Sequence, residues 1–230
     1  GYASEFDALL DEDRRTARES TAFESACLVG NAHRNRYFNV LANEHSRVKL
    51  KACLHDGDTD YINANIIPAA LPCSPRDPSY YATQAPVPET MAHFWQMVYE
   101  ARSAVIVMLT SEYEARSDLP KVDRYWPTLV GAREQYGWFL GENLGDNLAQ
   151  SSPIIERRFR LYGPQKEAPL VVTQLQYVDW PDQDVPENPQ AILDLIARAD
   201  ERANGAPPGA PIVVHCSAGV GRTGTFVAID

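Results

Sequence analysis

The segment from Val213 to Gly224 reads VVHCSAGVGRTG, and it restricts the fold of this chain more than any other segment. Its apolar start predicts a short buried strand over residues 212–215, and a loop of small residues follows directly. A helix is expected to begin near Thr223, where the loop ends. The backbone amides of such a loop converge on one point near the helix N-terminus, which favours a bound tetrahedral anion.

Cys216 comes directly after the predicted strand, and the positive potential of the loop amides favours its thiolate form, which is the nucleophile. Arg222 follows in the same loop and offers a planar pair of N–H groups to two phosphoryl oxygens. Thr223 is placed to donate its hydroxyl to the sulfur and to help the sulfur leave. The loop residues between them have small or absent side chains that let an anion approach the backbone: Ser217, Ala218, Gly219 and Gly221.

A buried cysteine in an ordinary strand-to-helix turn is the alternative interpretation of this segment. A cysteine and an arginine at fixed spacing would alone favour that alternative, because such pairs arise by chance. Here the strand, the small-residue loop, the arginine, the hydroxyl residue and the helix all occur in the expected order. We therefore interpret Cys216 as a nucleophile.

Apolar periodicity along the rest of the chain mixes strands and helices without strict alternation. This mixture is typical of an α/β or α+β domain, and 230 residues suffice for one domain with a sizeable core. We expect strands over residues 48–54, 61–67, 105–109, 157–161, 170–177 and 212–215, and helices over residues 4–27, 86–101, 189–203 and 223–230.

Composition argues against several classes of protein. Lysine and arginine number 21 against 31 aspartate and glutamate residues, and the resulting net charge of −10 disfavours binding to a nucleic-acid backbone. The longest apolar run, Ala104 to Leu109, is too short to span a membrane, and the charged start of the chain does not resemble a secretory leader. The 4 cysteines form no C-x-x-C pair, so we expect no metal site, reduced thiols and a cytoplasmic location.

The sequence HCSAGVGRTG resembles the signature loop of the protein tyrosine phosphatases, in particular of their phosphotyrosine-specific branch. Further segments resemble other motifs of this family, in the family's order and across nearly the whole chain. They are NRYFNV (35–40), RVKL (47–50), DYINAN (60–65), YYATQAPVPET (80–90), FWQMV (94–98), KVDRYWP (121–127) and WPDQDVPENP (180–189).

The resemblance implies a single catalytic domain over residues 1–230, built on a central, highly twisted mixed β-sheet flanked by helices. Domains of this family continue past the signature helix through further helices, including a glutamine-containing loop that positions the hydrolytic water. We therefore expect the chain to hold a domain that is incomplete on its C-terminal side.

The resemblance also implies a two-step hydrolysis of phosphotyrosine in signalling proteins, with no cofactor and no metal. The thiolate of Cys216 would attack phosphorus, and Arg222 would bind the phosphate. Asp182 would act first as general acid and then as general base. The implied ligands are phosphotyrosine-containing proteins and phosphate or similar oxyanions.

Substrate contacts follow from the same resemblance. Tyr37 would form an aromatic wall beside the phosphotyrosine ring with Val40 close by, and Asn39 would hold the substrate backbone. A phosphoserine side chain would be too short to bring its phosphate to Cys216. The other implied substrate-binding residues are Lys121, Gln183, Ser217, Ala218, Gly219, Val220 and Gly221.

Several supporting roles are also expected. Residues 33–51 are rich in arginine and lysine, which indicates either a solvated basic face or attraction of acidic phosphopeptides. We expect His215 to support the loop by hydrogen bonding rather than to act as a base. The resemblance further implies that Lys121 pairs with the general acid and that Glu114 braces Arg222.

Three positions depart from the family's pattern. Asp184 stands where the family has glycine, and a second carboxylate near the general acid is expected to shift the acid limb of the pH–rate profile. Ala85 replaces the glycine of the Gln-Gly-Pro motif. Val122 replaces a cysteine, so reversible oxidation of Cys216 is expected to proceed through the Ser217 amide nitrogen or an external thiol.

Two other functions fit parts of the pattern. A phosphotyrosine-binding pseudophosphatase, or an incomplete domain that binds without turnover, would not need an acid, so Asp182 favours the enzyme. A phosphoinositide or dual-specificity phosphatase shares the cysteine–arginine spacing but does not explain Tyr37.

Overall fold

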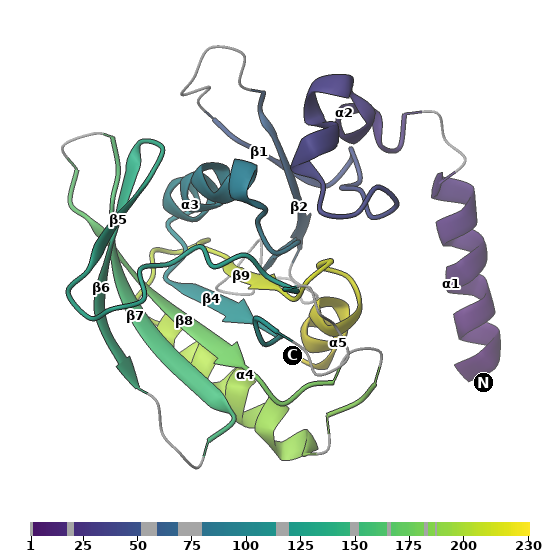
Figure 1. Cartoon of the computed structure of the whole chain (residues 1–230). Helices are drawn as coiled ribbons and strands as arrows, with labels where there is room; N and C mark the ends of the chain where they lie inside the picture. The colour runs from purple at the N-terminus through teal and green to yellow at the C-terminus, as the bar shows by residue number, and fades with distance from the viewer. Residues whose placement is uncertain are drawn as a thin grey trace.

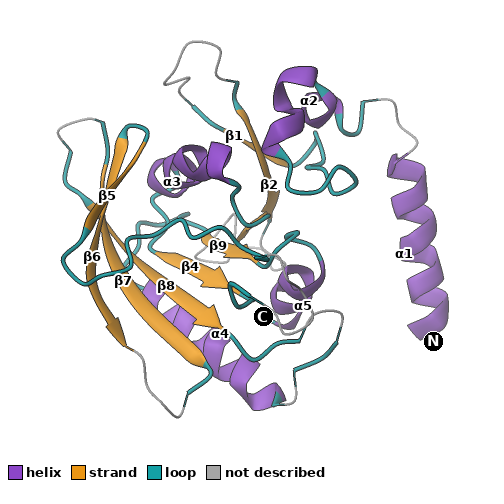
Figure 2. Ribbon diagram, viewed as in Figure 1, coloured by secondary structure: helices purple, strands orange, loops and turns teal. Residues whose placement is uncertain are grey.

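A mixed β-sheet of nine strands forms the centre of the part of the chain that the structure, a computed structural model, describes (Figures 1 and 2). The described residues are 2–17, 21–51, 59–68, 80–113, 120–147, 152–164, 167–181, 184–186 and 188–230. The strands lie in the order β1-β2-β3-β9-β4-β8-β7-β6-β5. Their bounds are β1 (Arg47–Lys49), β2 (Tyr61–Ile67), β3 (Tyr80–Thr83), β4 (Val105–Met108), β5 (Arg133–Tyr136), β6 (Phe139–Asn147), β7 (Ile154–Tyr162), β8 (Leu170–Tyr177) and β9 (Ile212–His215).

The four central strands, β3, β9, β4 and β8, are parallel, and the strands on either side of them pair antiparallel. β4 and β9 are buried along their whole length, as expected for parallel strands that are covered on both faces. β9 lies between β3 and β4, with His215 paired to Thr83 on one side and to Met108 on the other. The loop that begins at Cys216 therefore leaves the sheet between the carboxyl ends of two neighbouring strands.

Helices cover both faces of this sheet (Figure 2). Trp95 of α3 (Met91–Glu100) shares a hydrophobic core with Ile106, whereas Leu195 of α4 (Pro189–Ala203) shares a second core with Val107. Ile106 and Val107 are neighbours on β4, and successive side chains of a strand point to opposite faces. The helical segments are α1 (Tyr2–Ala17), α2 (Glu24–Cys27), η1 (Val29–Arg34), η2 (Pro88–Thr90), α3 (Met91–Glu100), α4 (Pro189–Ala203) and α5 (Gly221–Ile229).

Two predicted helices differ from the observed ones. The helix expected over residues 4–27 is interrupted, because residues 21–23 form a turn before α2, whose Ala26 packs against Tyr61 of β2. The helix expected over residues 86–101 begins only at η2 and continues as α3. Proline disfavours the helical conformation in the residue before it, so Pro88 keeps Val87 extended and the helical segment starts only at Pro88.

The sequence missed β3, β5 and β6. β6 reads FLGENLGDN, whose glycine, asparagine and aspartate residues have low strand propensity. It forms a strand because β5 and β7 pair with it on its two sides. The predicted strand over residues 48–54 overlaps β1 only in part, and residues 52–58 lie outside the described ranges. The predictions at 61–67, 170–177, 189–203 and 212–215 are confirmed with the same bounds.

The predicted fold class, a central twisted mixed sheet with flanking helices, is confirmed. Helix α1 lies to one side of this sheet and its flanking helices (Figure 1). Within the described ranges, no helix has both the length and the apolar character needed to cross a membrane.

Candidate active site

A pocket of about 460 Å³ opens at the carboxyl end of β9. It brings together seven residues that the sequence predicts for the site: Tyr37, Lys121, Cys216, Ser217, Ala218, Gly221 and Arg222. Three further residues complete its lining, namely Trp180, Asp184 and Thr225. Thr225 was not predicted, and the only signal for it is its position one turn into the helix that follows the loop.

The loop after β9 holds the thiol of Cys216 at the edge of this pocket. Cys216 is only 6% exposed, and the Gly219 amide donates a hydrogen bond to its Sγ at 3.3 Å. The Ala85 amide donates to the Ser217 carbonyl oxygen at 2.9 Å and so ties the loop to the segment after β3. A thiolate is stabilised by such amide donors, which is the physical basis for a nucleophilic sulfur here.

Gly219 is required for this loop conformation. Its φ is +79°, a region that side chains with a Cβ rarely adopt. An added Cβ would lie 2.3 Å from the carbonyl oxygen of Thr83 at the end of β3. The glycine therefore serves close packing of the loop against β3, a role that the sequence pattern did not indicate.

Helix α5 begins within the predicted anion-binding loop and carries two predicted catalytic residues. Arg222 is 8% exposed, and its Nη1 donates to the Leu109 carbonyl oxygen at 3.1 Å, just beyond the end of β4. Thr223 is fully buried, and among the described residues its hydroxyl has no hydrogen-bond partner. The expected bond from Thr223 to Sγ of Cys216 is thus not formed in this structure.

His215 supports the loop from inside the sheet. Its Nδ1 lies 2.8 Å from the carbonyl oxygen of Cys216, and its Nε2 lies 2.7 Å from the hydroxyl of Tyr125. Because a carbonyl oxygen only accepts, Nδ1 carries the proton and Tyr125 donates to Nε2. Complete burial lowers the pKa of His215 to about 4, so the ring is neutral near pH 7. Both nitrogens are occupied, in agreement with the expected supporting role.

Tyr37 is held at the pocket wall by a hydrogen bond to a residue far away in the sequence. Its hydroxyl lies 2.9 Å from Oγ of Ser217, which itself donates to the Lys121 carbonyl oxygen at 2.8 Å. Ser217 has only one proton, so Tyr37 donates to it. The preceding residue, Arg36, anchors this segment through its ion pair with Asp123 at 2.6 Å.

Four predicted substrate-binding residues do not line this pocket. Val40, Gly219 and Val220 line a separate, smaller pocket of about 260 Å³ beside the loop. Asn39 is exposed and lines neither of these two pockets.

The segment before helix α4 contributes Trp180 and Asp184 to the pocket. The Trp180 indole N–H donates to the Asp184 carbonyl oxygen at 3.0 Å, and the Asp184 carboxylate accepts from the Val185 amide at 2.8 Å. Asp182 and Gln183, the expected general acid and its neighbour, lie outside the described residues, as does Glu114. Their roles remain predictions.

Two arginines of the basic segment form ion pairs within the protein. Arg36 pairs with Asp123, and Arg47 pairs with Glu44 at 2.8 Å and with Asp60 at 3.1 Å. Arg34 is buried, with its Nη1 at 2.9 Å from Nε2 of His93. Lys49 and Lys51 of the same segment are exposed, so attraction of acidic phosphopeptides by this segment stays a prediction.

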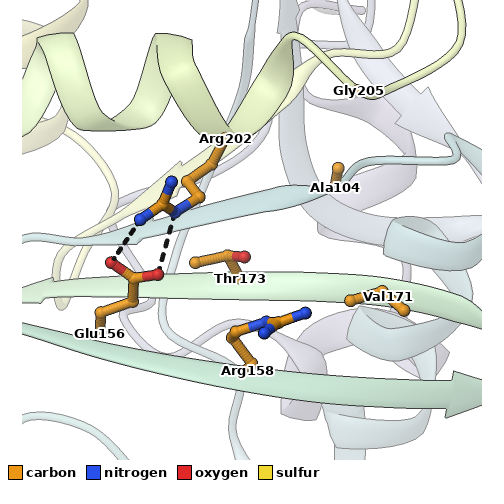
Figure 3. A pocket seen from close by; sticks show the side chains of 7 residues that line it. All are labelled: Ala104, Glu156, Arg158, Val171, Thr173, Arg202 and Gly205. Carbon is orange, nitrogen blue, oxygen red and sulfur yellow. Dashed lines mark hydrogen bonds and ion pairs between the residues drawn. The ribbon is translucent and has the colours of Figure 1, made fainter. Parts of the chain in front are cut away.

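A second hollow of about 460 Å³ lies at the opposite ends of the parallel strands, near Ala104 before β4 and Gly205 after α4 (Figure 3). Figure 3 shows Arg202 of α4 across from Glu156 of β7. Nε of Arg202 lies 2.9 Å from Oε1 of Glu156. Arg202 also pairs with Glu201 at 3.2 Å. These carboxylates neutralise the guanidinium of Arg202. Arg158 also lines the hollow, to which we assign no function.

No described group of three or more histidine, cysteine, aspartate or glutamate side chains is arranged to hold a metal ion. Among the predicted catalytic residues that the structure describes, Cys216 and Arg222 line the same pocket, with Tyr37 and Lys121 at its wall. A nucleophile, amide donors and a guanidinium in one pocket are suited to the transfer of a phosphoryl group.

Comparison with known proteins agrees with this chemistry. The family model for protein-tyrosine phosphatase matches residues 31–230. Receptor-type tyrosine-protein phosphatase F of Danio rerio is 40% identical over 208 residues, which is 90% of this chain and 10% of that protein. Tyrosine-protein phosphatase 1 of Dictyostelium discoideum is 39% identical over 211 residues, which is 85% of this chain and 38% of that protein. The chain thus spans about a tenth of the receptor-type relative's length.

Solved structures agree as well. The catalytic domain of human protein tyrosine phosphatase non-receptor type 18 aligns with a TM-score of 0.85 and 31% identity, covering 99% of this chain and 78% of that chain. A structure of PTPN18 in complex with HER2 phosphopeptides aligns with a TM-score of 0.86 and 32% identity, covering 99% of this chain and 81% of that chain.

Proposed function

Because this chain belongs to the protein-tyrosine phosphatase family, we propose that it removes phosphate from phosphotyrosine in proteins through a cysteinyl-phosphate intermediate. One observation carries the proposal. The Sγ of Cys216 accepts a hydrogen bond from the Gly219 amide, and Cys216 and Arg222 line the same pocket. Such a pocket can bind the phosphate and present a nucleophile to it.

In the first step, the thiolate of Cys216 attacks phosphorus, a P–S bond forms, and the bond from phosphorus to the tyrosine oxygen breaks. The guanidinium of Arg222 and the loop amides stabilise the charge on the phosphoryl oxygens. Asp182 donates a proton to the departing phenolate oxygen, as the family resemblance implies. Thr223 remains a candidate for assisting the sulfur.

In the second step, water attacks phosphorus, the P–S bond breaks, and phosphate and the thiolate are released. Asp182 takes the proton from the attacking water, because the acid of the first step becomes the base of the second. No cofactor or metal ion is required by this sequence of steps.

Selectivity for tyrosine rests on the depth of the pocket. Tyr37 stands at its wall with its hydroxyl bonded to Ser217, and its ring offers a face to an aromatic substrate side chain. The phosphate of a serine side chain would stop short of Cys216. Lys121 lines the same pocket, and Gln183, Asn39 and the loop residues are proposed as further substrate contacts.

Phosphotyrosine-containing proteins are the proposed partners, in keeping with PTPN18, whose structure contains HER2 phosphopeptides. We also place the activity in the cytoplasm, because a nucleophilic thiol is preserved where cellular thiols keep cysteines reduced. We also propose that residues 1–230 belong to one catalytic domain.

The test compares hydrolysis of a phosphotyrosine peptide with that of the matching phosphoserine peptide and of inositol phosphates. We expect turnover of the phosphotyrosine peptide alone, and none by the Cys216→Ser variant. Equal turnover of the three substrates would refute the depth argument. Binding of the phosphotyrosine peptide without release of phosphate would instead identify a binding module.

A further inference from the structure

Arg157 is a buried cation in the middle of β7. It is 8% exposed, and within the described ranges its guanidinium forms no ion pair with a carboxylate. Burial lowers the pKa of Arg157. Its guanidinium carbon lies 5.0 Å from the centroid of the Trp126 ring. Burying a charge without a paired carboxylate is costly, and such a group therefore calls for an explanation beyond packing.

The guanidinium donates to two neutral amides on the adjacent strand. Its Nη1 lies 2.9 Å from Oε1 of Gln174 and 2.8 Å from Oε1 of Gln176, and both glutamines are buried. Arginine has donors only, so each glutamine must present its oxygen to Arg157 and its NH₂ group to the far side. Arg157 thereby fixes the direction of both side-chain amides.

The first arm of this network ends at the nucleophile. Nε2 of Gln174 donates to the Tyr125 hydroxyl at 2.9 Å, which in turn donates to Nε2 of His215 at 2.7 Å. The opposite ring nitrogen, Nδ1, donates to the Cys216 carbonyl oxygen at 2.8 Å. Every donor therefore points from Arg157 toward the signature loop.

The second arm ends beside the phosphate-binding arginine. Nε2 of Gln176 donates to the Thr110 carbonyl oxygen at 3.0 Å. The neighbouring carbonyl oxygen, that of Leu109, accepts Nη1 of Arg222 at 3.1 Å. One buried cation thus orders the supports of both Cys216 and Arg222.

We propose that Arg157 is a positioning residue that sets the direction of this hydrogen-bond chain and so holds His215 as an Nδ1–H donor to the Cys216 carbonyl. The carbonyl of Cys216 and the amide N–H of Ser217 belong to one peptide group. Donation to the carbonyl polarises this group and strengthens the N–H as a donor at the anion pocket. The inference rests on the proposed function, because it assigns Arg157 to the support of its nucleophile.

The first readout is the ring ¹⁵N signals of His215, recorded by long-range ¹H–¹⁵N correlation. In the wild-type protein we expect a protonated Nδ1 and a hydrogen-bonded, unprotonated Nε2. In Arg157→Met, Gln174 is no longer forced to present its NH₂ group to Tyr125, so the Nε2 signal should move. Arg157→Lys also only donates and should restore the wild-type signal.

The second readout is the rate at which iodoacetate alkylates Cys216 at fixed pH. We expect Arg157→Met to lower the alkylation rate on the order of 10-fold, because it removes a partner that orients a reactive group indirectly. Arg157→Lys should recover the wild-type rate. Gln174→Leu should reproduce both effects. The matched control is Gln176→Leu, which cuts only the second arm and should leave the Nε2 signal in place.

Circular dichroism and thermal melting establish which variants are folded. A folded Arg157→Met variant with the wild-type Nε2 signal and alkylation rate would overturn the proposal. If Arg157→Met does not fold, the same two results for Gln174→Leu would overturn it. Neither readout requires phosphatase activity, so failure of the proposed function and failure of this inference are distinguishable.

Discussion

Replacing Gly219 by alanine is the sharpest test of how the signature loop is held. The added Cβ would lie 2.3 Å from the carbonyl oxygen and 2.4 Å from the carbonyl carbon of Thr83. These are backbone atoms at the end of β3, so they have no rotamer into which to move. Ordinary contact begins at 3.4 Å, so the loop must retreat by about 3.4 − 2.3 = 1.1 Å.

A displacement of this size affects both activity and stability. A shift of about 1 Å in a reacting group costs about 100-fold in rate, and Gly219 also donates the hydrogen bond to Sγ of Cys216. The left-handed backbone conformation costs a residue with a Cβ about 1–2 kcal/mol. We therefore expect Gly219→Ala to lower kcat/KM about 100-fold and the free energy of unfolding by about 1–2 kcal/mol.

The assays are hydrolysis of a phosphotyrosine peptide and urea denaturation. Gly205→Ala is the matched control, because a Cβ there would meet no atom within 4 Å and should change neither quantity. Wild-type kcat/KM together with wild-type stability in Gly219→Ala would refute the argument that the loop depends on close packing against β3.

Three further predictions follow from the site. Because burial lowers the pKa of His215 from 6.5 to about 4, the unfolded state binds more protons between these values, and stability should fall by about 3 kcal/mol as pH falls through this range. The measurement is denaturation at several pH values. His215→Gln should remove this loss of stability, whereas His33→Gln, a control at an exposed position, should retain it. Equal pH dependence of stability in the two variants would contradict the prediction. Asp184→Gly should move the acid limb of the pH–rate profile. An unchanged profile would refute the prediction that the Asp184 carboxylate affects the general acid. Peroxide should oxidise Cys216 without forming an internal disulfide, because Val122 replaces the neighbouring cysteine; mass spectrometry that detects such a disulfide would disprove this.

The sequence predicted the elements that carry the nucleophile because they are local. The apolar run of β9, the small-residue loop and the start of a helix follow one another in the chain, and their order needs no long-range contact. Cys216 and Arg222 could be assigned to one anion site for the same reason. The fold class followed from the mixture of elements and from the family resemblance.

The strands near one edge of the sheet were harder to predict. β5 is mostly polar, β6 carries polar residues and glycines along much of its length, and both become strands because neighbours pair with them. The break between α1 and α2 was missed for a related reason, since packing of Ala26 against Tyr61 holds α2 in place. Propensity is a weak guide wherever tertiary contacts decide the conformation.

The charge of the segment that carries Tyr37 also could not be read from composition. A local excess of arginine and lysine predicted a basic surface, but the acids that neutralise Arg36 and Arg47 come from distant positions, Asp123 and Asp60. Ion pairing between remote segments is decided by the tertiary fold.

By itself, the sequence determined which groups are available for the chemistry: a cysteine, an arginine and a loop of small residues, in an order that local geometry turns into an anion site. Only the tertiary structure decided what holds these groups in place. Gly219 packs against β3, Tyr37 reaches Ser217 from far along the chain, and Arg157 directs a buried hydrogen-bond chain to Cys216. The reason is physical, because these contacts join segments that are far apart in the chain and come together only when the sheet forms.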